Sequence, residues 1–294
     1  MTVTLHEPMP LRRHEIEHPV TAPPANLDID RSLPLLERLW GSPLFRRAAL
    51  LVLLAVIWQL YAVHLGNSLM FPPFTETLAA LWNGLLHGPL LARTLMSLSV
   101  LLTAYAIGVA LAAVFVTLAV STVVGQDLLT TLTAMFNPLP AIALLPLAML
   151  WFGLGQGSLI FVIVHSVVWA VALNALSGFT SVNETLRMSG QNYGLRGARY
   201  VILILIPAAL PAIIAGLKVG WAFAWRTIIA AELVFGATSR SGGLGWYIYQ
   251  NRNELETPSV FAGLFVVIII GLVVESLVFR TIENRTVRRW GMQR

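Results

Sequence analysis

The residues of this sequence best placed to do chemistry are charged side chains within stretches that are otherwise apolar. They are Lys218, Arg226, Glu232 and Glu275. A charge at the centre of a lipid bilayer costs at least about 2.5–3.5 kcal/mol, so each is expected to face protein or water. Four side chains fall at i, i+3, i+7 and i+14 of one helix and therefore share a stripe: Lys218, Trp221, Trp225 and Glu232. The stripe, with Arg226 on its flank, is predicted to line a polar pathway. The alternative is that the cations neutralise the glutamates while the tryptophans pack.

A second candidate for a polar lining is the interruption of the apolar stretch 128–152 by Asn137, Pro138, Pro140 and Pro146. Proline removes an amide donor, and broken helices in transporters expose backbone groups that can line a cavity. Prolines also occur in membrane helices for packing alone. Asn137 and Pro140 are therefore candidates for either role.

Metal, thiol and nucleotide chemistry have little support in this chain. The absence of cysteine excludes disulfides, thiol nucleophiles and cysteine metal sites. His165 has no second ligand at metal-binding spacing, so we predict no metal and expect His165 and Asn174 to be satisfied by neighbouring helices. A phosphate-binding loop needs Gly-Lys-Ser/Thr, which the sole lysine, in "GLKVG" (216–220), cannot supply. Any ATP must be hydrolysed by a partner.

A polar segment, residues 181–199, separates two apolar stretches and carries helix and turn signals. Ser181 and Glu184 have the spacing of a capping box, which predicts a helix that begins there. Gly194 and Gly197 predict two close turns with left-handed backbone. The segment is expected to form a helix, a sharp bend and a second helix at the membrane surface.

The apolar run that follows, residues 201–236, is too long for one straight membrane helix. Pro207 and Pro211 are expected to kink it, with Pro207 at its entry into the membrane. Gly216 and Gly220 form a G-x-x-x-G pattern, which allows two helices to approach closely.

Composition identifies the elements that position these residues as membrane helices. Of 294 residues, 57% are hydrophobic and 11% are charged, against about 25% charged in an ordinary soluble domain. A spanning helix needs about 20 mostly apolar residues. Six stretches qualify: residues 48–65, 90–120, 128–152, 158–179, 201–236 and 259–279. Buried helices of a soluble protein would need polar faces, yet residues 94–120 contain no charge. The fold class is an all-α integral membrane protein with six transmembrane helices.

Basic residues predict the orientation of these spans. With both termini cytoplasmic, fourteen of the nineteen basic residues lie in cytoplasmic segments and three lie outside. The net charge of +5 thus reflects topology and anionic lipid rather than nucleic acid. The chain divides into a cytoplasmic N-terminal tail (1–47), a membrane domain (48–280) with a loop at about 180–200 between spans four and five, and a cytoplasmic C-terminal tail (281–294).

Several segments resemble the permease subunits of bacterial ABC importers. The loop is similar to their "EAA" pattern, which ends in a glycine, nine further residues and the motif I-x-L-P. In this chain the glycine of the pattern is Gly194, and the motif falls at Ile204, Ile206 and Pro207. It departs from the pattern at 188–190, where "MSG" replaces Glu-Ala-Ala, with Glu184 one turn earlier. Five further segments resemble the nitrate, sulfonate, taurine and bicarbonate branch: "FPPFTETLAALW" (71–82), "NPLPAIALLPLAMLWFGLG" (137–155), "AWRTIIAAELVFGA" (224–237), "GGLGWYI" (242–248) and "ENRTVRRW" (283–290).

This resemblance implies a type I ABC importer permease fold, with a cytoplasmic coupling helix between spans four and five. It implies two permease copies in a homodimer, two ATPase subunits that bind ATP, and a periplasmic binding protein, at the bacterial cytoplasmic (inner) membrane. The chain itself would hold no cofactor and would not be an enzyme. The residues expected to couple to the ATPase are Glu184, Arg187, Met188, Ser189, Gly190, Tyr193, Gly194, Arg196 and Arg199. The resemblance also favours Asn137 and Pro140 as pathway residues.

The same resemblance implies alternating access and a small anion, such as a sulfonate, taurine or nitrate, delivered by the binding protein. Two alternatives stay open. One is an importer permease for a neutral pyrimidine-type vitamin precursor, and the other is a secondary transporter driven by an ion gradient, although no convincing internal repeat is visible. A membrane enzyme would need clustered His, Asp or Glu near one face, whereas the six histidines are scattered.

Overall fold

The computed structural model describes residues 40–235 and 242–287, in which all regular structure is helical. The first elements are α2 (Pro43–Leu65), α3 (Phe74–Leu86), α4 (Leu90–Ser121), α5 (Val123–Phe136), η1 (Ala141–Leu144), α6 (Leu145–Phe152) and α7 (Gln156–Thr180). They are followed by α8 (Glu184–Asn192), α9 (Gly197–Tyr200), η2 (Val201–Leu205), α10 (Ile206–Phe235), α11 (Leu244–Asn253), α12 (Thr257–Val273), η3 (Val274–Phe279) and α13 (Arg280–Arg285). The chain divides into two units between Leu54 and Ala55, within α2.

Within the described residues, five helices are long and apolar enough to span a membrane: α2, α4, α7, the helix of η2 and α10, and the helix of α12, η3 and α13. The remaining predicted span is broken. Its two parts, α5 and the helix of η1 and α6, meet at an angle of 86°. The prediction of six spans is therefore confirmed as five continuous helices and one bent pair. The bent pair begins at Val123, earlier than the predicted residue 128.

The break in the third span falls at the prolines that the sequence singled out. Asn137 closes α5 by donating its amide to the Thr133 carbonyl at 3.0 Å. Pro140 is extended, with ψ of 116°, and η1 starts directly after it. Because Pro138 and Pro140 have no amide hydrogen, the ladder of backbone hydrogen bonds cannot run through this segment.

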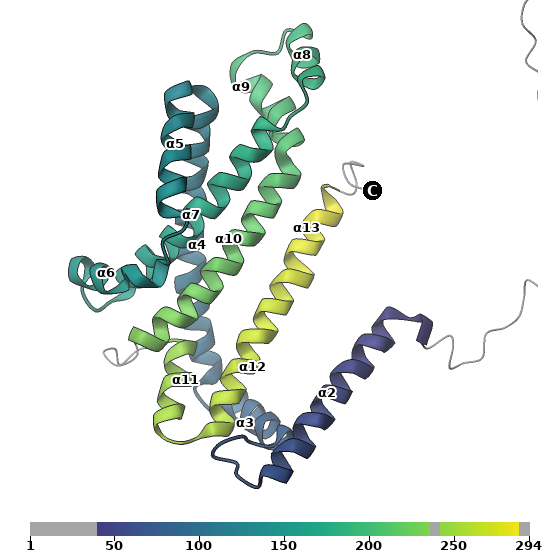
Figure 1. Ribbon diagram of the computed structural model, residues 1–294, viewed down its shortest axis with the longest axis vertical. Helices are drawn as coiled ribbons and strands as arrows, with labels where there is room; N and C mark the ends of the chain where they lie inside the picture. Colours follow the sequence, from purple (N-terminus) through teal and green to yellow (C-terminus); the bar gives the residue numbers. More distant parts are fainter. Residues whose placement is uncertain (1–39, 236–241, 288–294) are drawn as a thin grey trace, which may run out of the picture. The chain divides into compact units, whose positions relative to one another are not determined.

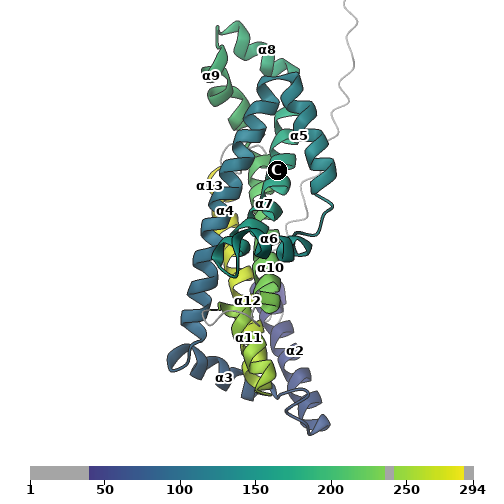
Figure 2. The same cartoon turned by 90° about the vertical axis from the view of Figure 1, so that its left-hand side faces the viewer.

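The centre of the larger unit is α7, which packs most extensively against α10 and α4. In its most apolar stretch of 18 residues, 56% of the residues are buried, against 33% in the corresponding stretch of α4 and 22% in that of the helix of η2 and α10. Figures 1 and 2 show α7 and α10 side by side. A Cβ at Gly216 would lie 2.7 Å from the Asn174 Cβ, and one at Gly220 would lie 2.7 Å from Val171 Cγ2. The prediction that this glycine pair allows close helix packing is confirmed.

The long run that contains Pro207 and Pro211 stays helical from Val201 to Phe235. Its irregular part is the π-helical turn η2, which ends at Leu205, two residues before Pro207, while Pro211 lies inside α10. A π turn shifts the hydrogen-bond register where a proline lacks a donor. The loop after α7 is thus joined to α10 by one continuous helix.

Two helices, α3 and α11, lie outside the predicted spans and pack against α12. An aromatic cluster centred on Trp58 joins this region to the end of α2. The Trp58 ring lies within 5.4–5.8 Å of the rings of Phe71, Phe74, Phe261 and Phe265. Its indole nitrogen donates to the Pro72 carbonyl at 2.9 Å. The indole nitrogen of the half-buried Trp58 therefore has a partner.

Candidate functional site

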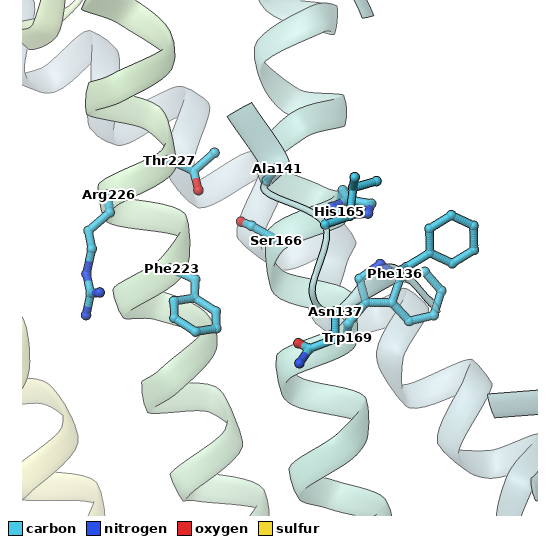
Figure 3. Close-up of a pocket in the computed structure, with 10 residues that line it drawn as sticks. Phe136, Asn137, Ala141, His165, Ser166, Trp169, Phe223, Arg226 and Thr227 are labelled. Carbon is cyan, nitrogen blue, oxygen red and sulfur yellow. The ribbon is translucent and has the colours of Figure 1, made fainter. Parts of the chain in front are cut away.

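A cavity of about 170 Å³ lies where the broken third span meets α7 and α10 (Figure 3). The break contributes Phe136, Asn137, Leu139 and Ala141; α7 contributes His165, Ser166 and Trp169; and α10 contributes Phe223, Arg226 and Thr227. The 86° bend positions the first group, because a straight helix would carry residues 137–141 past α7 rather than against it. Of the predicted pathway residues, Asn137 and Arg226 line this cavity, and Pro140 lies within the break.

The α7 wall of the cavity carries polar atoms without partners. Both ring nitrogens of His165 and the indole nitrogen of Trp169 are shielded from solvent and make no hydrogen bond within the described residues. The expectation that neighbouring helices satisfy His165 is therefore wrong. Asn174, by contrast, donates to the Ala170 carbonyl of its own helix at 2.8 Å. Sequence reasoning missed Trp169, although its place four residues after His165 puts both on one helical face.

Arg226, on the α10 wall, is the one formally charged residue among those that line the cavity. Its guanidinium carbon lies 5.8 Å from the centre of the Phe223 ring. Among the described residues, no acidic side chain lines the cavity and none forms an ion pair with Arg226. Figure 3 shows Arg226 at the margin of the site, on the far side of Phe223 from His165.

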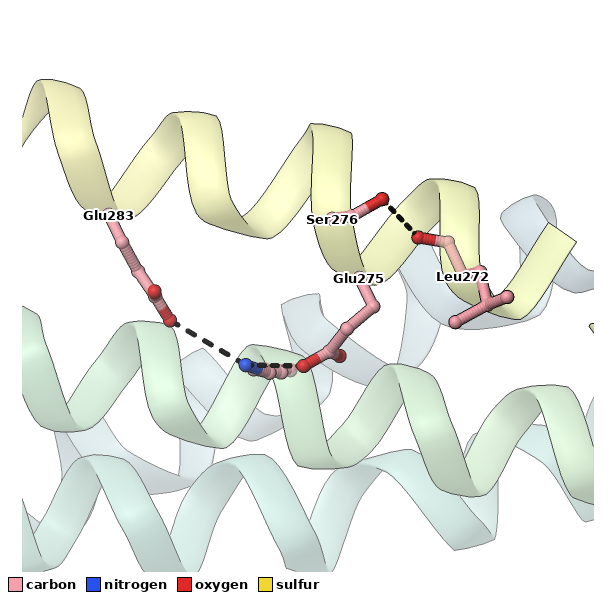
Figure 4. A network of polar contacts seen from close by, with 5 residues as sticks. Leu272, Glu275, Ser276 and Glu283 are labelled. Carbon is pink, nitrogen blue, oxygen red and sulfur yellow. Dashed lines mark hydrogen bonds and ion pairs between the residues drawn. The ribbon is translucent and has the colours of Figure 1, made fainter. Parts of the chain in front are cut away.

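The other intramembrane charges have partners elsewhere in the chain. Lys218 pairs with Glu275 at 2.6 Å and lies 3.9 Å from Glu283, which ties α10 to η3 and α13 (Figure 4). Glu232 is 4% exposed, and its carboxylate accepts hydrogen bonds from Ser97 Oγ and from the Gly245 amide, both at 2.7 Å. For Lys218 the structure therefore contains the alternative arrangement, in which the lysine neutralises a glutamate, here Glu275.

The buried Glu232 belongs to a junction of three helices. Ser97 Oγ of α4 also accepts the Leu244 amide at 2.7 Å, so two amides of the first turn of α11 are satisfied. Arg93 reinforces the junction by donating to the Gly242 carbonyl at 2.7 Å. A carboxylate at a helix N-terminus is favourable because the helix dipole is positive there.

The two tryptophans of the predicted stripe contact other helices of the chain. Trp225 donates its indole hydrogen to the Val267 carbonyl at 3.2 Å. Trp221 packs edge-on to Tyr105, with ring centres 5.5 Å apart, and Tyr105 in turn donates to the Leu217 carbonyl. The stripe therefore lies where α10 meets α4, α11, α12 and η3, and not at the cavity.

The loop between α7 and α10 forms α8, as predicted, but by a different cap. Asn183 accepts the Thr185 amide at 2.9 Å as N-cap. Ser181 instead ends α7, where its hydroxyl donates to the Gly178 carbonyl, so the capping box predicted from Ser181 is wrong. The bend after α8 is as expected, since Gly194 and Gly197 have φ of +74° and +57°.

The residues expected to couple to an ATPase divide into an exposed and an anchoring group. Glu184, Met188, Ser189, Tyr193, Gly194, Arg196 and Arg199 are exposed. Arg187 reaches back to α7, donating to the carbonyls of Phe179 at 2.6 Å and Val182 at 3.2 Å. Gly190 is buried, and a Cβ there would lie 3.0 Å from Ile204 and 3.1 Å from Tyr200. The sequence carried no signal for the contacts of Gly190 with Ile204 and Tyr200.

A multi-pass helical chain with a polar cavity at a broken span has the architecture of a membrane transport component. The family model described as "binding-protein-dependent transport system inner membrane component" matches residues 107–287. The chain belongs to this family. Within the described residues, no group of three or more His, Asp or Glu side chains could hold a metal ion.

Three relatives illustrate the similarity. The taurine transport system permease protein of Escherichia coli is 31% identical over 261 residues, which are 84% of this chain and 91% of that protein. A putative ABC transporter permease protein of Methanocaldococcus jannaschii is 30% identical over 233 residues, 78% of this chain and 86% of the relative. The nitrate import permease protein of Synechocystis sp. is 27% identical over 248 residues, 82% and 88% of the two chains.

Membership of this family makes the chain a membrane permease subunit of an ABC importer and not an enzyme. It is a multi-pass protein of the inner membrane, and an importer permease works with an ATPase and a substrate-binding protein. The prediction of an importer permease is confirmed. The vitamin-precursor and ion-gradient alternatives are not favoured.

Proposed function

We propose that this chain, paired with a second copy of itself, forms the translocation pathway for a small substrate with an oxyanion group, such as taurine, another sulfonate or nitrate. Two ATPase subunits bind ATP, a periplasmic binding protein delivers the substrate, and both chain termini lie in the cytoplasm. The observation that carries the proposal is the cavity at the broken span, where Arg226 faces no acidic residue within the described ranges 40–235 and 242–287. The names of the taurine and nitrate permeases support the substrate class.

In this proposal the predicted pathway residues have two roles. Asn137, Pro140 and Arg226 belong to the pathway, since they form or line the cavity. The stripe residues hold α10 in place through contacts with helices of the same chain; they are Lys218, Trp221, Trp225 and Glu232. A fixed α10 keeps Arg226 at a constant position relative to α7.

We also propose that α8 is the coupling helix that docks on the ATPase. Met188 and Tyr193 are 51% and 85% exposed, which is typical of side chains that fill a partner's groove. Arg187 ties α8 to the end of α7, and Gly190 packs against Tyr200 and Ile204. A displacement of α8 therefore moves α7 and, through the continuous helix from Val201, α10. Closure of the ATPase dimer would switch the pathway from inward to outward facing in this way.

The test is ATP-driven uptake by the complete complex in proteoliposomes, with the binding protein and ATP on opposite sides of the membrane. Uptake of labelled taurine or nitrate that needs both components supports the proposal. Tyr193→Ala should lower co-purification of the ATPase at least tenfold, because exposed aromatic residues dominate many interfaces. Trp82→Ala, at a 65% exposed residue of α3, is the matched control. Uptake that runs without the ATPase would overturn the proposal.

A further inference from the structure

We infer that a groove between α4 and α10 binds an anionic phospholipid, with the lipid phosphate on Arg187 and one acyl chain along the groove. The groove exists because α4 and α10 both pack extensively on α7 but make few contacts with each other. It contains two cavities, one beside α8 and one deeper between the spans. The inference concerns a lipid and not the transported substrate, so it does not rest on the proposed function.

The deeper cavity is suited to a hydrocarbon chain. It measures about 240 Å³, more than the engineered cavities of about 150 Å³ that hold benzene. Within the described residues, Thr117 is the one polar residue of its lining. Ala113 and Ile206 in its walls are exposed, so a lipid chain can enter from the side. At its deep end the Tyr105 hydroxyl donates to the Leu217 carbonyl at 2.8 Å, which joins α4 to α10.

The cavity beside α8 continues the groove toward its polar end. It measures about 570 Å³, and Arg187, Tyr200 and Ser121 are among the residues that line it. Thr117 lines both cavities. The two are also linked through Phe179, which lines the deeper cavity while its carbonyl accepts a hydrogen bond from Arg187. The groove therefore changes from charged and polar to apolar along its length, in the same order as a phospholipid.

Arg187 can reach a ligand in this groove. Its Nε and Nη2 atoms donate to the carbonyls of Val182 and Phe179 at 3.2 and 2.6 Å, which fixes the guanidinium in place. Its third nitrogen, Nη1, makes no hydrogen bond within the described residues and is not shielded from solvent. Among those residues, no acidic side chain lines either cavity. The remaining donors and the charge are thus available to a phosphate oxygen.

The depth of the groove matches one leaflet of a bilayer. Ser121 lines the cavity beside α8 and Val109 lines the deeper one, both on the uninterrupted helix α4. At a rise of about 1.5 Å per residue, they lie about 18 Å apart along the helix axis. One leaflet contributes about half of a hydrocarbon core of about 30 Å. An acyl chain that starts near Arg187 therefore ends close to the Tyr105–Leu217 contact.

The charge of the loop makes the site selective among lipids. A groove that opens to the membrane is filled by some hydrocarbon chain in any case, so selectivity must come from the headgroup. Arg196 and Arg199 are exposed in the same loop as Arg187. Basic pockets between membrane helices attract anionic headgroups, by about 1 kcal/mol for each basic residue near the surface. A zwitterionic lipid gains much less from this field.

The experiment titrates the permease, purified in mild detergent with the partners it retains, with phosphatidylglycerol and separately with phosphatidylcholine. Native mass spectrometry counts the bound lipid. Phosphatidylglycerol should bind at least about tenfold more tightly. Arg187→Gln should raise its Kd about ten- to one-hundred-fold, because the phosphate loses a charged donor. Arg199→Gln is the matched control, at an exposed arginine of the same loop that lines neither cavity, and should change the Kd less than about threefold.

A second pair of variants tests the apolar part of the groove. Ala113→Phe fills the deeper cavity without touching Arg187, so it should weaken binding of both lipids about tenfold. Ala110→Phe is its control, at an exposed alanine of α4 that lines neither cavity. Size-exclusion profiles verify that each variant folds. Because Arg187 also ties α8 to α7, Ala113→Phe decides the question if Arg187→Gln does not fold.

Three results would overturn the inference. The first is equal affinity of the parent protein for the two lipids, which would mean that any chain fills the groove. The second is unchanged phosphatidylglycerol binding in a folded Arg187→Gln or Ala113→Phe variant. The third is a disulfide between two permease copies carrying Thr117→Cys in native membranes, because a second copy would then occupy the groove. The chain has no cysteine of its own, so this thiol is unique in the permease.

Discussion

Two tryptophans with similar packing have opposite polar surroundings. Trp58 lies among four phenylalanine rings and donates its indole hydrogen to the Pro72 carbonyl. Trp169 lies between two phenylalanine rings, yet its indole nitrogen has no partner within the described residues. Packing alone therefore does not separate an anchor from a site. The hydrogen bond of the indole nitrogen distinguishes the two tryptophans, because a buried donor without a partner destabilises the fold.

The charged residues repeat this contrast. Glu232 is buried with hydrogen bonds from Ser97 and Gly245, which pin α11 against α4 and α10. Arg226 lines the cavity with no acidic partner in the part of the chain that the structure describes. A buried charge that accepts or donates hydrogen bonds within the chain stabilises the fold, whereas a charge that lines a cavity without such a partner is available to a substrate.

The largest expected effect comes from removing the anchor. Trp58→Ala should lower the free energy of unfolding by about 3 kcal/mol, because it empties the centre of the aromatic cluster. The measurement is thermal unfolding of the detergent-solubilised complex, followed by intrinsic fluorescence. Trp82→Ala, at an exposed tryptophan, should cost less than about 0.5 kcal/mol. If both variants lost a similar amount of unfolding free energy, Trp58 could not be distinguished from an exposed surface tryptophan.

Breaking the satisfied charge should come next. Glu232→Ala should lower the free energy of unfolding by about 2 kcal/mol, because it leaves the Ser97 hydroxyl and the Gly245 amide without their acceptor. Glu232→Gln keeps an acceptor and should cost less. Limited proteolysis should show faster cleavage near α11 in the alanine variant. Unchanged stability in both variants would contradict a pinning role.

Removing the unpaired charge should affect transport rather than stability. Arg226→Gln should reduce ATP-driven uptake about tenfold, the equivalent of about 1.4 kcal/mol, with a change in unfolding free energy below about 0.5 kcal/mol. Arg226→Lys should give an intermediate rate, because lysine keeps the charge and loses the planar fork of donors. Initial rates in proteoliposomes measure both. A destabilised Arg226→Gln would place this arginine among the anchors.

The smallest effect is the sharpest test of the comparison. Trp58→Phe should cost about 1 kcal/mol because the Pro72 carbonyl loses its donor. Trp169→Phe should be neutral or slightly stabilising, because it removes a buried donor that has no partner. Both keep an aromatic ring, so the difference between their unfolding temperatures isolates the hydrogen bond. Equal losses would mean that the Trp169 nitrogen is satisfied, for example by water.

The sequence indicated much of the fold and part of the site. Apolar length marked the spans, and the prolines after Asn137 marked the break that shapes the cavity. It also singled out Asn137 and Arg226, which do line that cavity. The positions of α3 and α11 were missed because each helix is too short to span a bilayer. Ser181 was mistaken for a cap because Asn183, two residues later, offers the same chemistry.

What the sequence determined by itself was local: the helical spans, the break near Pro140, the close packing at Gly216 and Gly220, and the turns at Gly194 and Gly197. These features depend on the length of an apolar run, on the missing amide hydrogen of proline and on the backbone freedom of glycine. Each of these acts within one stretch of the chain, so the order of residues is enough to predict it. Only the tertiary structure decided which polar groups find partners. Ser97 and Glu232 meet across 135 positions of sequence, and the Trp169 nitrogen has no partner within the described residues, where Phe115 and Phe136 stack on its ring. Such pairings depend on which helix faces meet, and no local pattern specifies that.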